Sequence, residues 1–193
     1  MTAAAGSKAL RQLFIDTGAL LEGHFQLSSG LHSPNYMQCA LLLANPAVAE
    51  TLGASLAEIA PERPDLILSP ALGGVVIGQE VARALKVRHY FMERENGALT
   101  LRRGFALKPG ERFLVVEDVV TTGKSTKEVI AAADALGARN VGVLSIVDRT
   151  GGVSGLPLTS LLAMQIPAYK PEDCPLCKRN IDLVKPGSRP QAR

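Results

Sequence analysis

The strongest pattern in the chain is the alternation of apolar runs and helical periodicity along residues 61–149. Short apolar runs of strand length are separated from one another by polar segments and by segments whose apolar residues recur at helical spacing. We expect strands at residues 65–69, 88–92, 113–117 and 141–147, and helices that end near Leu85 and Leu136. Strands that alternate with helices are typical of a parallel sheet. The pattern therefore predicts an α/β fold with a doubly wound, mainly parallel sheet flanked by helices.

The first 45 residues follow a different pattern. From Lys8 to Glu22 the apolar residues recur near helical spacing, which predicts an amphipathic helix that Gly23 ends. Residues 23–39 then alternate apolar and polar positions around a Ser-Gly step, which indicates a short hairpin. A further helix should begin after Asn45, because an Asn-Pro step supplies a cap and a first-turn proline.

The length of 193 residues fits a single domain. We expect one domain over residues 1–193, with a small hood at about 1–45 that the C-terminal segment completes, and an α/β core at about 46–150. The polar segment 93–109 has only a brief apolar alternation, which predicts a mobile arm or hairpin. Residues 150–193 hold two short apolar runs and a tail rich in Pro and Gly.

The stretch 113–126, FLVVEDVVTTGKST, combines a strand, an acidic pair and a hydroxyl-rich loop. A buried parallel strand ends at the sheet edge where open α/β folds bind ligands, so Glu117 and Asp118 should lie at that rim. Their carboxylates can accept hydrogen bonds from sugar hydroxyls. The loop offers backbone N–H groups, hydroxyls and a cation at a helix N-terminus, where the helix dipole favours an anion. The loop residues are Thr121, Thr122, Gly123, Lys124, Ser125 and Thr126.

The Gly-Lys-Ser-Thr run is not a nucleoside triphosphate loop, because that motif requires a glycine where this chain has Asp118. Carboxylates beside an anion cup instead describe a site for a ribose 5-phosphate unit. The stretch closely resembles the signature of type I phosphoribosyltransferases, which bind phosphoribosyl pyrophosphate (PRPP). The resemblance implies that family's fold and places the pyrophosphate at Gly73 and Gly74, which follow the first core strand. A close crossing of helix and strand is the alternative reason for these two glycines.

Residues 29–36 read SGLHSPNY and resemble the N-terminal substrate motif of the orotate phosphoribosyltransferases. In that family the hairpin covers the base, and an arginine at a strand end binds the orotate carboxylate, a role that suits the planar fork of arginine. The resemblance implies an orotate site formed by Ser29, Gly30, Ser33, Tyr36, Thr122 and Arg149. A surface turn and a surface ion pair between Asp148 and Arg149 are the alternatives for these two segments.

Two departures from the family pattern concern the pyrophosphate. Many orotate enzymes carry a lysine where this chain has Gly73, and the mobile loop of many relatives carries more cations than residues 93–109 do here. The adjacent Arg102 and Arg103 are the obvious substitutes, although solvated surface charge is the alternative for them. The catalytic residues that the resemblance implies are Glu117, Asp118, Arg94, Arg102 and Arg103.

The implied reaction transfers the 5-phosphoribosyl group from PRPP to N1 of orotate, giving orotidine 5′-monophosphate and pyrophosphate, in de novo synthesis of UMP. Relatives commonly act as homodimers with shared active sites. They use Mg2+ held mainly through PRPP, since Mg2+ is seldom caged wholly by protein, and we predict no metal site formed by the protein itself. The alternatives are a phosphoribosyltransferase for a purine or for uracil, and a non-enzymatic PRPP-sensing regulator that binds nucleic acid.

Net charge and hydropathy limit the classes of binding partner that we expect. Lys and Arg number 21 and Asp and Glu 18, so the net charge of +3 does not favour nucleic acid or a membrane surface. No apolar run approaches the ~20 residues that span a bilayer. We expect a cytoplasmic protein with small-molecule substrates, without a nucleic-acid or membrane partner.

The three cysteines are too few for a disulfide framework. Cys39 lies in an apolar segment and should belong to the core. Cys174 and Cys177 have the spacing of half a zinc site or of a redox pair, but structural zinc takes four ligands and the sequence has no second such pair. We interpret the segment as a structural turn, with a zinc shared across a dimer or a reversible disulfide as the alternatives. The histidines show no metal-ligand spacing: His24, His32 and His89.

Overall fold

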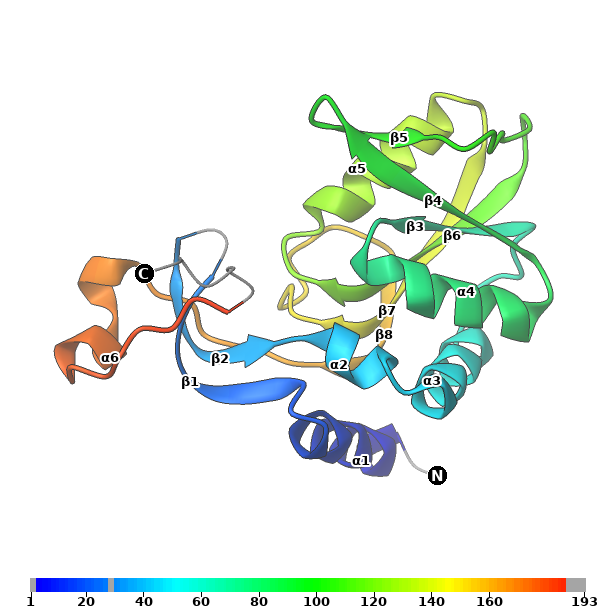
Figure 1. Cartoon of the computed structure of the whole chain (residues 1–193). Coiled ribbons are helices and arrows are strands. Elements are labelled where there is room, and N and C mark those ends of the chain that lie inside the picture. The colour runs from blue at the N-terminus through cyan, green and yellow to red at the C-terminus, as the bar shows by residue number, and fades with distance from the viewer. Residues whose placement is uncertain (1–2, 28–29, 187–193) are drawn as a thin grey trace.

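A computed structural model describes residues 3–27 and 30–186 of the chain (Figure 1). The helices are α1 (Ala3–Asp16), α2 (Cys39–Leu43), α3 (Pro46–Glu58), α4 (Gly73–Leu85), α5 (Lys124–Asp134) and α6 (Pro175–Lys178), with a 3-10 turn η1 (Pro171–Asp173). The strands are β1 (Leu20–Gln26), β2 (His32–Met37), β3 (Leu66–Pro70), β4 (Arg88–Glu95), β5 (Ala98–Leu101), β6 (Arg112–Val120), β7 (Arg139–Asp148) and β8 (Leu158–Ala163).

A six-stranded sheet with the order β5-β4-β3-β6-β7-β8 forms the centre of the molecule (Figure 1). β4, β3, β6, β7 and β8 are mutually parallel, and β5 is an antiparallel edge strand. Taken in chain order, the parallel strands have the spatial arrangement 2-1-3-4-5, whose direction of winding reverses between β3 and β6. The predicted doubly wound α/β fold is confirmed. Ligands bind at such a reversal, beyond the carboxyl ends of the two strands.

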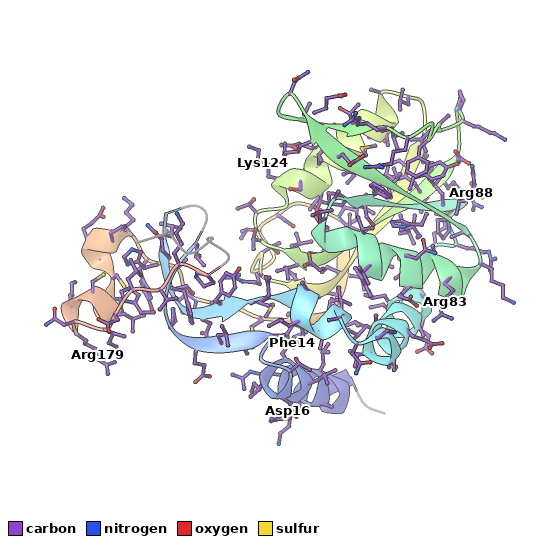
Figure 2. All side chains as sticks on the ribbon, in the orientation of Figure 1. Phe14, Asp16, Arg83, Arg88, Lys124 and Arg179 are labelled. Atoms are coloured by element: carbon purple, nitrogen blue, oxygen red, sulfur yellow. The ribbon has the colours of Figure 1, made fainter. Side chains whose placement is uncertain are left out.

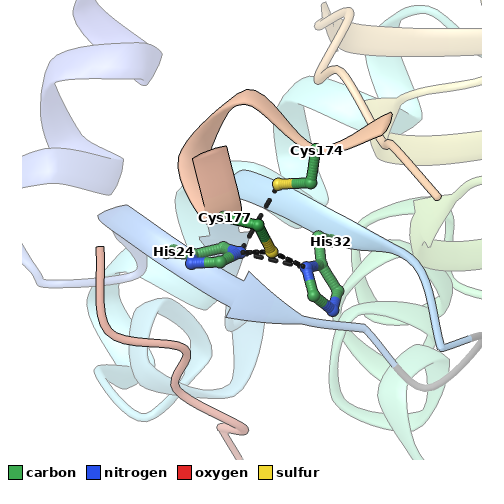
Figure 3. A group of neighbouring side chains, drawn as sticks. All are labelled: His24, His32, Cys174 and Cys177. Atoms are coloured by element: carbon green, nitrogen blue, oxygen red, sulfur yellow. Dashed lines mark hydrogen bonds between the residues drawn. The ribbon is translucent and has the colours of Figure 1, made fainter. Parts of the chain in front are cut away.

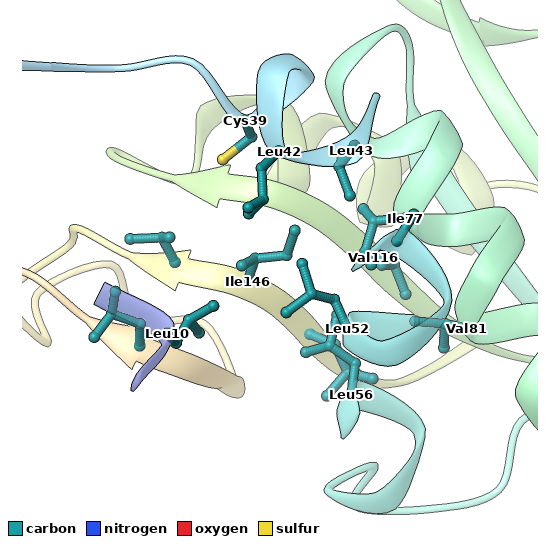
Figure 4. Packing of buried hydrophobic residues seen from close by; sticks show 14 of the residues in the cluster. Leu10, Cys39, Leu42, Leu43, Leu52, Leu56, Ile77, Val81, Val116 and Ile146 are labelled. Carbon is teal, nitrogen blue, oxygen red and sulfur yellow. The ribbon is translucent and has the colours of Figure 1, made fainter. Parts of the chain in front are cut away.

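The central strand β6 is buried on both faces, which explains its continuous apolar run. Leu114 and Val116 belong to a core cluster that includes buried residues of α3 and α4. Phe113 and Val115 belong to a second cluster that includes buried residues of α5. Alternate residues of β6 therefore face the two helical layers. Figure 4 shows part of the first cluster, with Val116, Ile146, Leu52, Leu56 and Ile77.

Several helix and strand boundaries agree with the predictions, and others differ from them. α3 begins at Pro46, and the Asn45 side chain accepts a hydrogen bond from the Ala47 N–H as a cap. The predicted strand at 113–117 runs on to Val120, since β6 pairs with β7 beyond the acidic pair. β4 continues to Glu95 and pairs with β5, so the polar segment after residue 93 begins as a hairpin. The first apolar run after residue 150 forms β8, which the sequence pattern did not identify as a strand.

The predicted helix at residues 8–22 is wrong in its second half. α1 ends at Asp16, and Gly18 adopts a left-handed φ of +68° that reverses the chain into β1. Leu20 is buried from a strand rather than from a helix, so its helical spacing from the leucines of α1 was coincidental. Phe14 of α1 points into the core while Asp16 faces outward (Figure 2).

The antiparallel pair β1 and β2 forms the predicted hairpin, which stands away from the large sheet (Figure 1). The C-terminal segment lies along it: Phe25 forms a parallel bridge with Val184, and His32 an antiparallel bridge with Tyr169. The hairpin and residues 164–184 are called the hood below. In the described part of the chain, no helix combines the length and the apolar character needed to cross a bilayer.

Candidate functional site

The acidic pair lies on β6 beside the point where the sheet reverses its winding. Neighbouring residues on a strand point to opposite faces, and the two carboxyl groups are separated in this way. Glu117 is buried and lines a cleft with the loop that leads into α5. Asp118 is half-buried on the side of α4. The pair therefore offers carboxylate oxygens on both sides of the same strand end.

The predicted anion cup forms one continuous wall of that cleft. Gly123 adopts φ +74° as the residue before α5, and α5 begins at Lys124. The Lys124 N–H donates to the Thr122 hydroxyl at 3.4 Å, and the remaining first-turn N–H groups have no acceptor within the helix. The wall consists of Val119, Val120, Thr121, Thr122, Gly123, Lys124, Ser125 and Thr126. The arrangement suits an anion the size of a phosphate.

Burial changes the ionisation of the acidic pair. Burial and then the charge of Asp118 raise the pKa of Glu117 to about 8. Burial also raises the pKa of Asp118, while hydrogen bonds from backbone N–H groups, including that of Val119 at 2.9 Å, act in the opposite direction. Glu117 is therefore largely protonated at neutral pH, so one carboxyl group can donate a hydrogen bond and its neighbour can accept one.

The loop after β3 approaches β6 more closely than a side chain would allow. A β-carbon at Gly73 would lie 2.6 Å from Asp118 Oδ1, and one at Gly74 would lie 2.7 Å from the Val116 carbonyl oxygen. These two glycines bring the N-terminus of α4 against the acidic pair, as a close crossing of helix and strand requires. Any side chain at position 73 would require the Asp118 carboxyl group to move. The loop contains a cis peptide bond between Ala71 and Leu72.

Arg149 follows β7 at the same sheet edge, where its N–H donates to the Val120 carbonyl at 2.8 Å. Within the described residues, two buried side-chain atoms have no hydrogen-bond partner, Arg149 Nε and Ser145 Oγ. Ser145 is the register partner of Glu117, so both atoms belong to the strand ends around the cleft. Burial lowers the pKa of Arg149. Arg149 is half-buried as a residue, and its buried Nε–H is available to a hydrogen-bond acceptor such as a carboxylate.

The predicted arm arginines form ion pairs with nearby acids rather than entering the cleft. Arg103 binds Glu93 through two hydrogen bonds of 2.7 and 2.8 Å, and Arg102 lies 3.5 Å from Glu95. Arg94 donates to Glu128 of α5 at 2.7 Å. Glu128 Oε1 lies 4.0 Å from the Lys124 ammonium, so Glu128 links Arg94 to a residue of the anion cup.

The predicted orotate residues of the hood are engaged with the hood itself. The Ser33 hydroxyl is fully buried and donates to the Pro167 carbonyl at 2.9 Å. The Tyr36 hydroxyl lies 3.5 Å from the Gln38 side-chain oxygen. Gly30 has φ +83° in the turn between the strands, and Ser29 lies outside the described residues. The orotate-binding roles of these residues remain predictions.

The hood also contains a cluster that spacing along the chain did not predict. His24 and His32 come from β1 and β2, Cys174 immediately precedes α6, and Cys177 lies within α6 (Figure 3). The donor atoms all lie within 4.8 Å of one another. The signal in the sequence was weak, because the histidines join the cysteines only when residues about 150 positions apart meet. The separate prediction that Cys39 belongs to the core is confirmed.

Comparison with known proteins agrees with this geometry. A family model described as the phosphoribosyl transferase domain matches residues 41–156. The orotate phosphoribosyltransferase of Carboxydothermus hydrogenoformans is 50% identical over 185 residues, covering 93% of this chain and 97% of that protein. That of Thermotoga maritima is 51% identical over 183 residues, covering 93% and 98%.

Solved structures confirm the predicted type I phosphoribosyltransferase fold. The crystal structure of orotate phosphoribosyltransferase from Aeropyrum pernix matches with a TM-score of 0.69 and 25% identity, covering 81% of this chain and 94% of that one. An adenine phosphoribosyltransferase from Thermoanaerobacter pseudethanolicus has the same fold, with a TM-score of 0.60 and 19% identity over 67% and 88% of the two chains. The chain belongs to the phosphoribosyltransferase family and, within it, to the orotate phosphoribosyltransferases.

Proposed function

We propose that this protein transfers the 5-phosphoribosyl group of PRPP to N1 of orotate, giving orotidine 5′-monophosphate and pyrophosphate in the synthesis of UMP. The observation that carries the proposal is the cleft at the carboxyl end of β6, which Glu117 and the phosphate-sized cup line. Asp118 is the next residue of the strand, and Arg149, whose Nε has no partner, follows the neighbouring strand β7. Identity of about half of all positions to named orotate phosphoribosyltransferases supports the choice of base.

The chemistry asks the protein to position two substrates and to balance charge. The bond from C1 of the ribose to pyrophosphate breaks as the bond to N1 of orotate forms, with positive character on the sugar. In this proposal the loop at residues 121–126 holds the 5-phosphate, and Glu117 and Asp118 bind the ribose hydroxyls. The N-terminus of α4 accepts the pyrophosphate, and Arg149 binds the orotate carboxylate. Orientation and preorganised electrostatics supply the rate, so no covalent nucleophile is required.

The acidic pair is compatible with a bound Mg2+ but does not form a cage for it. Two carboxyl groups on opposite faces of one strand can contribute at most part of an oxygen shell, and Mg2+ retains several water or substrate ligands in such sites. We propose that Mg2+ binds mainly through oxygens of PRPP and water, while Glu117 and Asp118 act chiefly on the ribose hydroxyls. Its chemistry is to neutralise pyrophosphate charge as the leaving group departs.

We further propose a cytoplasmic homodimer in which the arm carrying Arg94 to Arg103 completes the neighbouring chain's site. The Arg103 side chain is 60% exposed, so a second chain can reach it. A mixture of Arg103→Ala chains with Asp118→Ala chains tests the idea, because a shared site predicts activity in the mixture that neither variant has alone. If the mixture recovers no activity, the result counts against the shared site. It does not bear on the proposed reaction.

One steady-state assay tests the reaction. Pyrophosphate release from PRPP should depend on orotate and should not occur with adenine, xanthine or uracil. Turnover with one of those bases instead would move the protein to another branch of the family. If PRPP binds in calorimetry and none of the four bases supports turnover, the alternative of a PRPP-sensing regulator is favoured.

A further inference from the structure

We propose that His24, His32, Cys174 and Cys177 bind one structural Zn2+ ion within a single chain. The observation is geometric. His24 Nε2 lies 3.0 Å from His32 Nδ1 and 3.5 Å from Cys174 Sγ, and Cys177 Sγ lies 3.2 Å from His32 Nδ1 and 3.7 Å from His24 Nε2 (Figure 3). Four ligand atoms at roughly 2.0–2.3 Å from a tetrahedral centre lie roughly 3.3–3.8 Å from one another. These four of the six donor separations are therefore close to those of a tetrahedral zinc shell, and all six lie within 4.8 Å.

The tautomer of His24 suits a metal ligand. Its Nδ1 lies 2.7 Å from the Ile181 carbonyl oxygen, which can only accept a hydrogen bond, so the proton of a neutral ring belongs on Nδ1. Nε2 is then left with a lone pair directed at the other three residues. A ligating histidine commonly donates its second N–H to a backbone carbonyl in this way, which fixes the ring. The Ile181 carbonyl is thus an outer partner of the proposed site.

Charge and burial favour zinc over an unmetallated cluster. His24, His32 and Cys174 are at most 5% exposed. Two thiolates and two neutral imidazoles balance the charge of one Zn2+, so the buried centre is neutral overall. Two sulfur and two nitrogen ligands in tetrahedral array select zinc among common divalent metals. Four protein ligands also leave no open position, which is typical of structural rather than catalytic sites.

The ion would join the hairpin of β1 and β2 to the C-terminal segment that contains α6. The histidines lie on the hairpin strands that flank residues 27–31, and the cysteines lie on the C-terminal segment. Other links between the hairpin and this segment are the bridges of Phe25 with Val184 and of His32 with Tyr169, and the hydrogen bond from Ser33 to Pro167. The proposal concerns the hood alone, and its outcome does not depend on the enzymatic activity.

The metal content of the full-length protein, purified without a histidine tag, tests the site directly. We expect about one zinc per chain. A double variant, Cys174→Ser with Cys177→Ser, should lose at least roughly tenfold of that zinc, and so should His24→Gln. Cys39→Ala is the matched control, because Cys39 is also buried but packs in the core cluster and is not one of the four clustered residues, so the variant should retain the zinc.

X-ray absorption of the wild-type protein keeps the test independent of variants that fail to fold. We expect about two nitrogen ligands at roughly 2.0–2.1 Å and about two sulfur ligands at roughly 2.3 Å. A shell of four sulfurs with half a zinc per chain would mean an ion shared between two chains, and would overturn the proposal. So would zinc-free protein in which mass spectrometry finds Cys174 and Cys177 joined as a disulfide, or zinc that persists in all ligand variants.

Discussion

The rim of the sheet and the hood are built in opposite ways. At the rim, one continuous stretch from Glu117 to Thr126 supplies the acids, the cup and the start of a helix. In the hood, the side chains that meet come from positions about 150 apart, and many of them are polar. The rim continues the buried sheet, whereas the hood is held by contacts between distant parts of the chain. The proposed chemistry and the proposed zinc site therefore lie in differently built regions of the molecule.

The largest expected effect lies at the rim. Asp118→Asn should lower kcat/KM by roughly 10- to 150-fold, because a hydrogen bond from substrate to a charged group contributes about 1.5–3 kcal/mol. Steady-state kinetics with orotate and PRPP measure it. Asp134→Asn, at the exposed end of α5, is the control and should change little. Equal losses in both variants would mean that the acidic pair has no special role.

Substitution of Arg149 tests whether a residue of the sheet rim contributes to recognition of the base. Arg149→Ala should raise KM for orotate by roughly 10- to 100-fold and leave KM for PRPP nearly unchanged, since one charged bidentate contact is lost. Arg139→Ala is a matched control at the other end of the same strand, where the arginine pairs with Glu62 on the surface. A rise in KM for PRPP instead of orotate would place Arg149 in the phosphoribosyl site.

The acidic pair should also make the stability of the rim depend on pH. Glu117 ionises near 4.5 in the unfolded chain and near 8 in the folded one, so the folded state binds more protons between these values. Its contribution to the free energy of unfolding is therefore complete at low pH and is lost as the pH rises through about 8, with a slope of at most about 1.4 kcal/mol per pH unit.

Urea unfolding of wild type and Glu117→Gln across this range measures the difference. Glutamine stays neutral, so the variant should gain stability relative to wild type as the pH rises. A constant difference between the two proteins would show that Glu117 is ionised throughout.

The smallest expected effect lies in the hood and tests whether Ser33 binds substrate or only supports the hairpin. If its bond to Pro167 is the main role, Ser33→Ala should cost about 0.5–1.5 kcal/mol of unfolding free energy and change KM for orotate by less than about twofold. Thermal unfolding and kinetics on the same sample distinguish the roles. A large rise in KM for orotate with unchanged stability would support the predicted contact with the base.

The same contrast explains which parts of the molecule could be predicted. The core strands, the loops that follow them and the residues of the cup were accessible, because apolar runs and turn residues report local structure. The end of α1 was not, since Leu20 has the same spacing in a helix that continues and in a strand that follows Gly18. β8 was missed because no ordinary helix precedes it.

Parts of the candidate site could not be predicted from the sequence. The close approach of Gly73 to Asp118 and the pairing of Arg103 with Glu93 depend on distances between strands that neighbouring residues do not encode. The gathering of His24 and Cys174 is the extreme case, because no short-range pattern joins the two residues.

The meeting of the two chain ends in the hood has a consequence for synthesis. β1 and β2 are made before residues 169–184, which lie along them in the folded chain. The sheet between them can form while the chain is still being made, because all of its strands precede residue 164. We therefore expect the nascent protein to hold a formed sheet while the hairpin of β1 and β2 still lacks the contacts of residues 169–184. Truncation of the chain before residue 169 should therefore destabilise this hairpin.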